Sequence, residues 1–227
     1  MMKGSLMFKF PRSLLLFLLF LSGCVGIVDS VRTPLIGFGD IKAEYHFDTP
    51  QSSLDTFRLA DDAAFFAISD EALTGSVLAD RGYIWSLNQP QYSNTSIKAT
   101  LQQERGGKGN GFGVMCRADN DGNGYYFVVS SEGQFAILKA EPGVSNPVQL
   151  VKWQSSGAVK KDDGINSIEA ICLDDYLSFT VNGVFIAEAR DSTFKSGHTG
   201  VVLGAVGQTL WVRFDDIVIQ DVRVIGG

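Results

Sequence analysis

Apolar and polar residues alternate along most of the chain after about position 42. In the segment 95–102, the side chains of Ile97, Ala99 and Leu101 fall on one face and their polar neighbours on the other. The same period of two recurs in 176–181 and in 210–215. Because successive side chains of a β-strand point to opposite faces, this pattern predicts strands that each bury one face.

Turn-forming residues separate these predicted strands. Asn182-Gly183 stands between two apolar runs and is typical of a type I′ hairpin, whose two central residues need positive φ. The runs 131–133, 119–124 and 174–175 predict further turns. About a dozen short strands at this spacing predict an all-β fold, a two-sheet antiparallel sandwich.

The N-terminus has the pattern of an export signal. Lys3, Lys9 and Arg12 precede an apolar run at 14–21. This run is too short to span a bilayer, which takes about 20 apolar residues, but it fits a secretory signal. It ends in Leu21-Ser22-Gly23-Cys24, which resembles the lipobox of bacterial lipoproteins, in which the chain is cut just before a cysteine that receives diacylglycerol.

The chain is therefore expected to have four parts. Residues 1–23 form the signal peptide, 24–41 the lipidated Cys24 and a tether, 42–222 the sandwich, and 223–227 a tail. Lipid on Cys24 would hold the protein on the extracytoplasmic face of a bacterial membrane. An ordinary signal peptide with a chance cysteine is the alternative.

The other two cysteines, Cys116 and Cys172, are expected to form a disulfide. Their number is even, and disulfides persist outside the cytoplasm. The bond would close a loop of about 55 residues and stabilise the fold by about 4 kcal/mol in the chain-entropy model. Two buried free thiols are the alternative.

The charge balance argues against a nucleic-acid partner. The net charge is −6, and no cluster of lysine and arginine stands out. Phosphate backbones are bound through a basic footprint, which this sequence lacks.

Several motifs in the second half of the chain together resemble a known superfamily. They are 111–117 (GFGVMCR), 125–127 (YYF), 133–135 (GQF), 166–172 (NSIEAIC), 177–183 (LSFTVNG), 197–201 (GHTGV) and 214–217 (FDDI). In this order they resemble the concanavalin A-like (laminin G-like) jelly-roll superfamily, and the closest branch is the bacterial domains related to 3-keto-disaccharide hydrolases. The resemblance implies a jelly roll over 42–222 and, through that branch, a hydrolase of 3-keto-disaccharides or related glycans.

Catalytic patterns are missing from the sequence. Retaining glucanases of the superfamily carry Glu-x-Asp-x-x-Glu on one strand, whereas the predicted strands here hold isolated acids such as Glu104 and Glu169. The two histidines, His46 and His198, have no partner at metal-ligand spacing. We therefore expect no catalytic residue and no transition-metal site.

Calcium is the one cofactor that a motif suggests. Asp119, Asp121 and Asn123 match the first half of a calcium-binding loop, but Ser130 stands where a bidentate glutamate would complete it. A hairpin turn rich in Asn, Asp and Gly has the same pattern, and we favour this interpretation.

Sugar binding would use exposed aromatic rings with polar side chains beside them. The candidate aromatic residues are Tyr83, Trp85, Tyr92, Trp153 and Trp211, and Arg117 and Asn94 are polar residues of suitable type. Core packing is the alternative for each aromatic residue. Trp211 is expected to lie outside the core, because it alternates with Leu210 and Val212.

These observations predict a membrane-anchored lipoprotein whose jelly roll is a non-catalytic binding or interaction module. Its expected partners are the membrane, through the lipid anchor, and a carbohydrate or another envelope component. A hydrolase acting on 3-keto-disaccharides is the alternative, and a purely architectural envelope role is a third hypothesis.

Overall fold

The computed structural model describes residues 33–48, 54–79 and 81–226 of the chain. The predicted signal peptide and Cys24 lie outside these residues. Pro34–Gly227 forms one compact unit. In the part of the chain that the structure describes, no helix is long and apolar enough to cross a membrane.

The described residues contain fifteen strands and one short 3-10 helix, Ala60–Asp62. The strands are β1 (Ile36–Tyr45), β2 (Phe57–Arg58), β3 (Ala64–Ser69), β4 (Ala72–Val77), β5 (Tyr83–Tyr92), β6 (Thr95–Arg105), β7 (Gly111–Ala118), β8 (Gly124–Val129), β9 (Gln134–Ala140), β10 (Val148–Ser155), β11 (Asn166–Leu173), β12 (Tyr176–Val181), β13 (Val184–Arg190), β14 (Gly197–Gly204) and β15 (Leu210–Val224).

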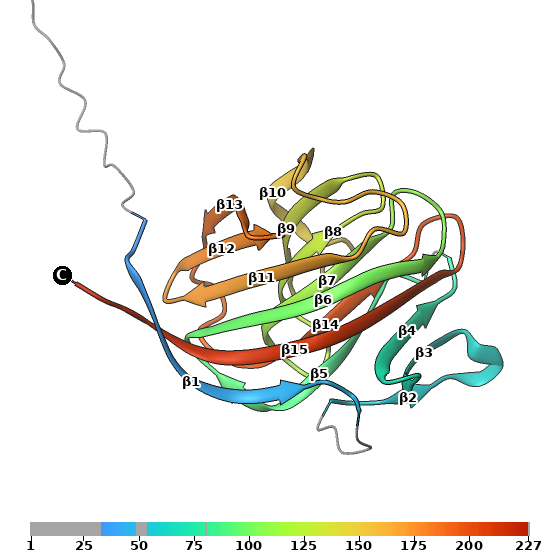
Figure 1. Ribbon diagram of the computed structural model, residues 1–227, viewed down its shortest axis with the longest axis horizontal. Helices are drawn as coiled ribbons and strands as arrows, with labels where there is room; N and C mark the ends of the chain where they lie inside the picture. The colour runs from blue at the N-terminus through green and yellow to red at the C-terminus, as the bar shows by residue number, and fades with distance from the viewer. Residues whose placement is uncertain (1–32, 49–53, 80, 227) are drawn as a thin grey trace, which may run out of the picture. The chain divides into compact units, whose positions relative to one another are not determined.

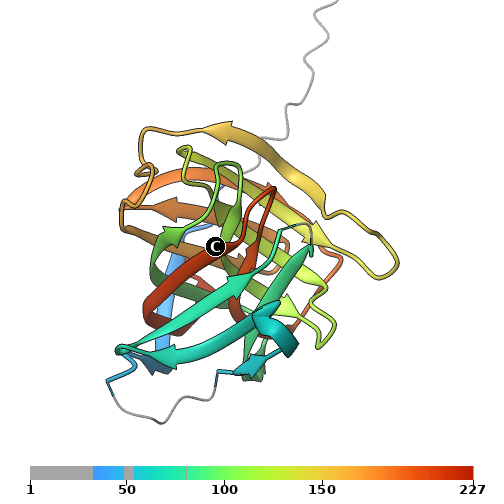
Figure 2. The same ribbon diagram turned by 90° about the vertical axis from the view of Figure 1, so that its right-hand side faces the viewer.

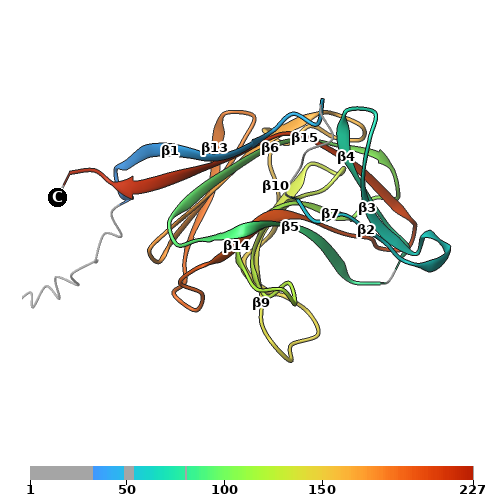
Figure 3. The ribbon, with the colours of Figure 1, turned by 90° about the horizontal axis from the view of Figure 1, so that it is seen from below.

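These strands form two antiparallel sheets that are stacked face to face (Figures 1 and 3). The large sheet has the order β13-β12-β11-β6-β15-β4-β3-β2, and β1 also pairs with β15. The small sheet has the order β10-β9-β8-β7-β14-β5. Strands β2, β3 and β4 lie at the end of the molecule that faces the viewer in Figure 2. The predicted two-sheet antiparallel sandwich is confirmed.

The core lies between the sheets and is built by the alternation seen in the sequence. On β6, Ile97, Ala99 and Leu101 are buried, whereas Lys98 between them is exposed. Rings from both sheets meet in this layer: Phe127 of β8 contacts Phe179 of β12 with centroids 5.6 Å apart. The sandwich is thus closed by apolar side chains from every second position.

The hairpin predicted at Asn182-Gly183 is confirmed. Asn182 has φ 51° and Gly183 has φ 77°, which is the positive pair that a type I′ turn requires. Val181 pairs with Val184 across the turn. The Asn182 side chain also accepts a hydrogen bond from Ser167 N at 2.9 Å, which ties the turn to β11.

The sandwich extends beyond the predicted limits 42–222 at both ends. β1 begins at Ile36, inside the range 24–41 expected to be a tether, and β15 ends at Val224, inside the expected tail 223–227. These two ends pair with each other, Ile36 opposite Val224. Residues 36–41 therefore belong to the sheet. Asp40 and Ile41 break the period of two in this segment, and the pairing with β15 shifts register between Phe38 and Ile41.

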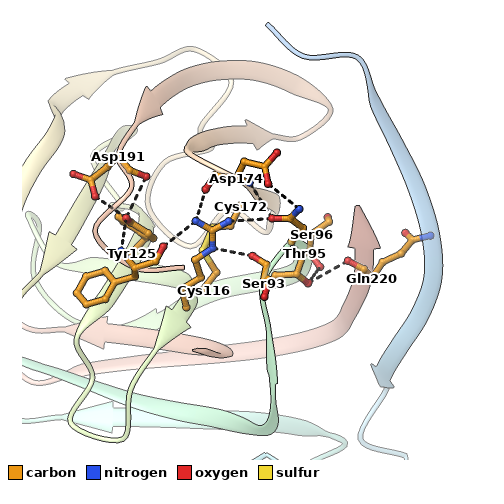
Figure 4. Close-up of a disulfide and its surroundings, with 12 residues drawn as sticks. Ser93, Thr95, Ser96, Cys116, Tyr125, Cys172, Asp174, Asp191 and Gln220 are labelled. Atoms are coloured by element: carbon orange, nitrogen blue, oxygen red, sulfur yellow. Dashed lines mark hydrogen bonds between the residues drawn. A yellow bond between two sulfur atoms is a disulfide. The ribbon is translucent and has the colours of Figure 1, made fainter. Parts of the chain in front are cut away.

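A disulfide joins Cys116 on β7 to Cys172 on β11. It therefore links the small sheet to the large sheet, and both cysteines are fully buried. Figure 4 shows the bond in the interior of the sandwich. The favoured pairing is confirmed, with a sequence separation of 56 residues.

Removing this bond is expected to destabilise the folded protein, because the unfolded chain then has a higher conformational entropy. In the chain-entropy model a loop of this length contributes about 4 kcal/mol. The double variant Cys116→Ala/Cys172→Ala should lose about that much free energy of unfolding in urea titrations at pH 7. Equal stability of the two unreduced proteins would contradict the role assigned to the bond.

Candidate functional site

The outer face of the small sheet, which points away from the core, is apolar. Its buried residues alternate along their strands with the core residues, and they are Leu87, Met115, Ala118, Tyr126, Val128, Ala136, Leu138 and Val202. Four aromatic side chains belong to the same cluster: Tyr83, Trp85, Tyr126 and Trp153. We call this surface the aromatic face. The outer face of an antiparallel sheet is usually polar, so the aromatic face is an unusual feature of the fold.

Glycine residues on β7 and β14 let two of these rings come close to the sheet. A Cβ atom on Gly111 would come within 2.8 Å of the Tyr83 hydroxyl and 3.3 Å of the Trp153 ring. A Cβ atom on Gly204 would come within 2.9 Å of the Tyr83 ring. Tyr83 and Trp153 stand on β5 and β10, the two edge strands of the small sheet. The two side chains therefore reach inward from opposite edges of the sheet and approach each other over Gly111 of β7.

Two hollows lie on either side of Tyr83. The first, which we call the glycine pocket, has a volume of about 580 Å³ and is lined by Arg81, Gly82, Tyr83, Gly109, Gly111, Ser145, Asn146, Pro147, Trp153, Gly204, Ala205 and Val206. The second, the edge pocket, has a volume of about 390 Å³ and is lined by Asp55, Phe57, Leu59, Tyr83, Ile84, Trp85, Leu87 and Asn120. Both volumes fall in the range typical of small-ligand sites.

The Tyr83 hydroxyl is a neutral hydrogen-bonding group in the wall between the hollows. Burial raises the pKa of Tyr83 to about 12, so the hydroxyl keeps its proton at neutral pH. Its ring lies 5.4 Å from that of Tyr126, whose hydroxyl donates to the Gly122 carbonyl. No other described residue forms a hydrogen bond with the Tyr83 hydroxyl, which leaves it free to bind a ligand.

The structure brings the predicted residues Tyr83, Trp85 and Trp153 together but separates Tyr92, Arg117 and Trp211 from them. Tyr92 stands at the opposite end of β5, in a polar hollow of about 460 Å³ that Gln91, Asn94 and Asp221 also line. Its hydroxyl donates to Asn88 Oδ1 at 3.1 Å. Tyr92 therefore belongs to a different surface from the aromatic face.

Trp211 lies outside the core, on the outer face of the large sheet. Its ring packs edge-on against Phe65, with centroids 5.2 Å apart, and the guanidinium of Arg105 lies 5.2 Å from its centre. These contacts half-bury the ring. Trp211 is thus on the other side of the sandwich from the aromatic face.

Arg117 is a structural residue, which corrects its assignment as a ligand-binding candidate. Its side chain is 1% exposed. Its guanidinium donates to the carbonyls of Ser93 at 2.8 Å, Asp174 at 2.6 Å and Phe194 at 3.0 Å. It thereby holds three loops at one end of the sandwich, a region that Figure 4 shows beside the disulfide. Burial lowers the pKa of Arg117.

Asp191 fixes one of these loops from the other side. Its carboxylate accepts hydrogen bonds from the Tyr125 hydroxyl at 2.6 Å and from Lys139 Nζ at 2.9 Å, and Thr193 N donates to it at 2.8 Å. Burial acts to raise the pKa of Asp191, but the hydrogen bonds from Tyr125, Thr193 and Lys139 outweigh it and hold the pKa well below its ordinary value. Figure 4 shows the Asp191–Tyr125 contact.

The loop 119–124 is a hairpin turn that uses its own acidic side chain. Asp119 Oδ1 accepts hydrogen bonds from the backbone N–H of Asp121 and of Asn123, both at 2.9 Å. Asp119 Oδ2 accepts one from Asn123 Nδ2 at 2.8 Å. Among the described residues, no group of three or more His, Cys, Asp or Glu side chains could hold a metal ion. These hydrogen bonds are typical of a turn and explain the spacing of Asp119, Asp121 and Asn123.

The sequence analysis named Trp153 among the candidates but missed Tyr126. The chain offered a signal for Tyr126, because Tyr125 and Tyr126 are neighbours in a strand and must point to opposite faces. Tyr125 points into the core and Tyr126 to the aromatic face. Nothing in the sequence alone shows that Trp153 and Tyr83 meet.

Comparison with solved structures identifies the type of sandwich. A carbohydrate-binding module, CBM66 from Bacillus subtilis, is similar with a TM-score of 0.60 and 16% identity, over 76% of this chain and 98% of that chain. A Bacillus subtilis protein of unknown function with a galectin-like fold is similar with a TM-score of 0.58 and 12% identity, over 84% of this chain and all of that chain. The fold is a galectin-like jelly roll.

This jelly roll also resembles part of a larger protein. The GH43 protein BlXynB from Bacillus licheniformis is similar with a TM-score of 0.57 and 13% identity, over 82% of this chain and 40% of that chain. No protein-family model and no curated protein sequence matches the chain.

The bonds to Asp191 predict a specific dependence of stability on pH. A carboxylate whose pKa is lower in the folded state stabilises it above the ordinary pKa, 3.8, and this stability is lost as pH falls below that value. Asp191→Asn should lower the free energy of unfolding by about 2 kcal/mol at pH 7, because hydrogen bonds to a charged group are lost.

Urea titrations at pH 7 and at about pH 3 would measure the free energy of unfolding of both proteins. The difference in this free energy between wild type and Asp191→Asn should be smaller at the acidic pH. Asp121→Asn, at an exposed turn position, is the matched control and should change little. A gap that stays constant with pH would contradict the role given to the Asp191 carboxylate.

Proposed function

We propose that the protein is a lipid-anchored, non-catalytic glycan-binding module on the extracytoplasmic face of a bacterial membrane. The observation that carries this proposal is the aromatic face, where rings of Tyr83, Trp85 and Trp153 border two hollows. A sugar ring has apolar C–H faces and a rim of hydroxyl groups. It is therefore bound by aromatic rings together with a few hydrogen-bonding side chains.

The polar groups that such a ligand needs surround the rings. In the glycine pocket they are the Tyr83 hydroxyl and the side chains of Arg81, Ser145 and Asn146. In the edge pocket they are Asp55 and Asn120. The similarity to a carbohydrate-binding module supports the same ligand class.

The charged groups around the hollows favour binding over hydrolysis. Glycoside hydrolysis commonly uses two carboxyl groups, about 5 to 9.5 Å apart, on either side of the bond. Of the described residues that line the two hollows, Asp55 is the only carboxylate, and its Oδ1 accepts a hydrogen bond from Gln89. Hydrolysis of 3-keto-disaccharides, which the sequence resemblance implies, is the alternative.

The lipid anchor rests on the sequence Leu21-Ser22-Gly23-Cys24 after an apolar run. The disulfide between Cys116 and Cys172 supports export, because such bonds persist outside the cytoplasm. Lipid on Cys24 would leave the aromatic face exposed to the envelope space, where glycans occur.

Trp153→Ala should weaken glycan binding by about tenfold or more, because truncating a central aromatic contact commonly costs more than 1 kcal/mol. The ligand would be chosen from the hits of a glycan array with the chain 25–227, and its affinity measured by calorimetry. Tyr83→Phe keeps the ring and removes the hydroxyl, so it separates stacking from hydrogen bonding.

Trp211→Ala is the matched control, since Trp211 lies on the other side of the sandwich. Equal loss of affinity in both Trp variants, or no hit on the array, would contradict the proposed site. Turnover of a panel of 3-keto-disaccharides by the purified protein would overturn the non-catalytic assignment.

The anchor can be tested on the protein made in a bacterial host. Mass spectrometry of the membrane fraction should show a mature chain that begins at Cys24 with diacylglycerol on its thiol. Cys24→Ser should abolish both the modification and the membrane association. A mature N-terminus at any other residue would sink the assignment.

A further inference from the structure

The start of β1 and the end of β15 form a two-stranded ribbon at one end of the sandwich. Ile36 pairs with Val224, Phe38 pairs with Val222, and Ile225 N donates to the Leu35 carbonyl at 2.8 Å. In Figures 1 and 3 this ribbon projects beyond the other strands, next to the mark for the C-terminus. We call the residues 35–38 and 222–225 the apolar ribbon.

Both faces of the apolar ribbon carry exposed apolar side chains. Leu35 is 68% exposed and Ile225 45% on one face, and Phe38 is 48% exposed and Val224 49% on the other. Only Val222 is buried, against Ile171 and Leu173 on the outer face of the large sheet. Exposed apolar side chains gathered on adjacent strands usually mark a contact with a partner or a membrane.

We propose that the apolar ribbon inserts into the surface of the lipid bilayer beside the acyl chains of Cys24. This inference rests on the lipid anchor proposed above. Ile36 lies twelve residue steps after Cys24. Even a fully extended chain of this length spans only about 40 Å, so the ribbon cannot leave the neighbourhood of the membrane. A short tether gives a high effective concentration, and a modest apolar contact is then enough for stable docking.

The charged residues around the ribbon are paired or of opposite sign, so apolar groups would make the contact with the bilayer. Lys42 is paired with Asp221 at 2.7 Å, and the exposed side chains of Asp40 and Arg223 are of opposite sign. Arg223 can keep its guanidinium in the headgroup layer while its stem follows the ribbon. Docking should therefore depend little on ionic strength.

Docking by this end would orient the glycan site away from the membrane. The glycine pocket is lined by Val206, which follows β14, and by Tyr83, at the start of β5. Both lie near the Leu210 end of β15, whereas the ribbon lies at its Val224 end. The fourteen residue steps between Leu210 and Val224 correspond to about 45 Å along an extended strand. The ribbon would face the bilayer while the aromatic face meets its ligand at a distance from it.

The test uses the full-length lipidated protein with Phe38→Cys, labelled with an environment-sensitive fluorophore and reconstituted into vesicles of phosphatidylethanolamine and phosphatidylglycerol. Insertion should shift the emission to the blue and make it severalfold more sensitive to nitroxide-labelled lipids than to a water-soluble quencher. Both effects should persist in high salt. Val206→Cys, at a residue that is 59% exposed at the opposite end, is the matched control and should report water.

The outcomes separate this inference from the proposed function. A label at position 38 that reports water, on protein whose Cys24 is shown by mass spectrometry to carry lipid, overturns the ribbon contact and leaves the anchor standing. An apolar signal that appears without lipid and grows with protein concentration also overturns it, because the partner is then a second copy. Protein without lipid on Cys24 removes the anchor and the inference together.

Discussion

The burial of one apolar face of each sheet against the other is the interaction on which the rest of this protein depends. Every second residue of the central strands enters this layer, including Ile97 of β6, Val114 of β7 and Phe179 of β12. The disulfide between Cys116 and Cys172 crosses the same layer and fixes β7 against β11. Because the layer is fully packed, every other surface of the molecule is positioned by it.

The small sheet is unusual because it is apolar on both sides. Its inner face belongs to the core, and its outer face is covered by its own aromatic side chains, which reach across glycines from the edge strands. Such a surface is only partly shielded from water, and the Tyr83 ring divides what remains into two hollows. The arrangement places apolar surface and hydrogen-bonding groups side by side at the two hollows.

The two ends of the sandwich differ in structure. At one end, Arg117 donates to three loop carbonyls and Asp191 accepts a hydrogen bond from Tyr125, so several loops are tied together. The apolar ribbon belongs to the same end, where Val222 N donates to the carbonyl of Asn94 in the adjacent turn. At the other end, the loop around Gly109 borders the glycine pocket, which Asn146 of the loop between β9 and β10 also lines. The proposed functions follow this division: attachment at the end that holds the apolar ribbon, and ligand contact at the end that holds the glycine pocket.

The sequence by itself determined the fold class, because alternation with period two and turn pairs such as Asn182-Gly183 are local properties of the chain. It also favoured a disulfide between Cys116 and Cys172, because their number is even and the N-terminus has the pattern of an export signal. The tertiary structure alone decided that Tyr83 and Trp153 meet, that Arg117 serves loops and not a ligand, and that residues 36–41 are strand. These facts depend on the register and curvature of strands far apart in the chain, and no local pattern records which neighbour a strand will have.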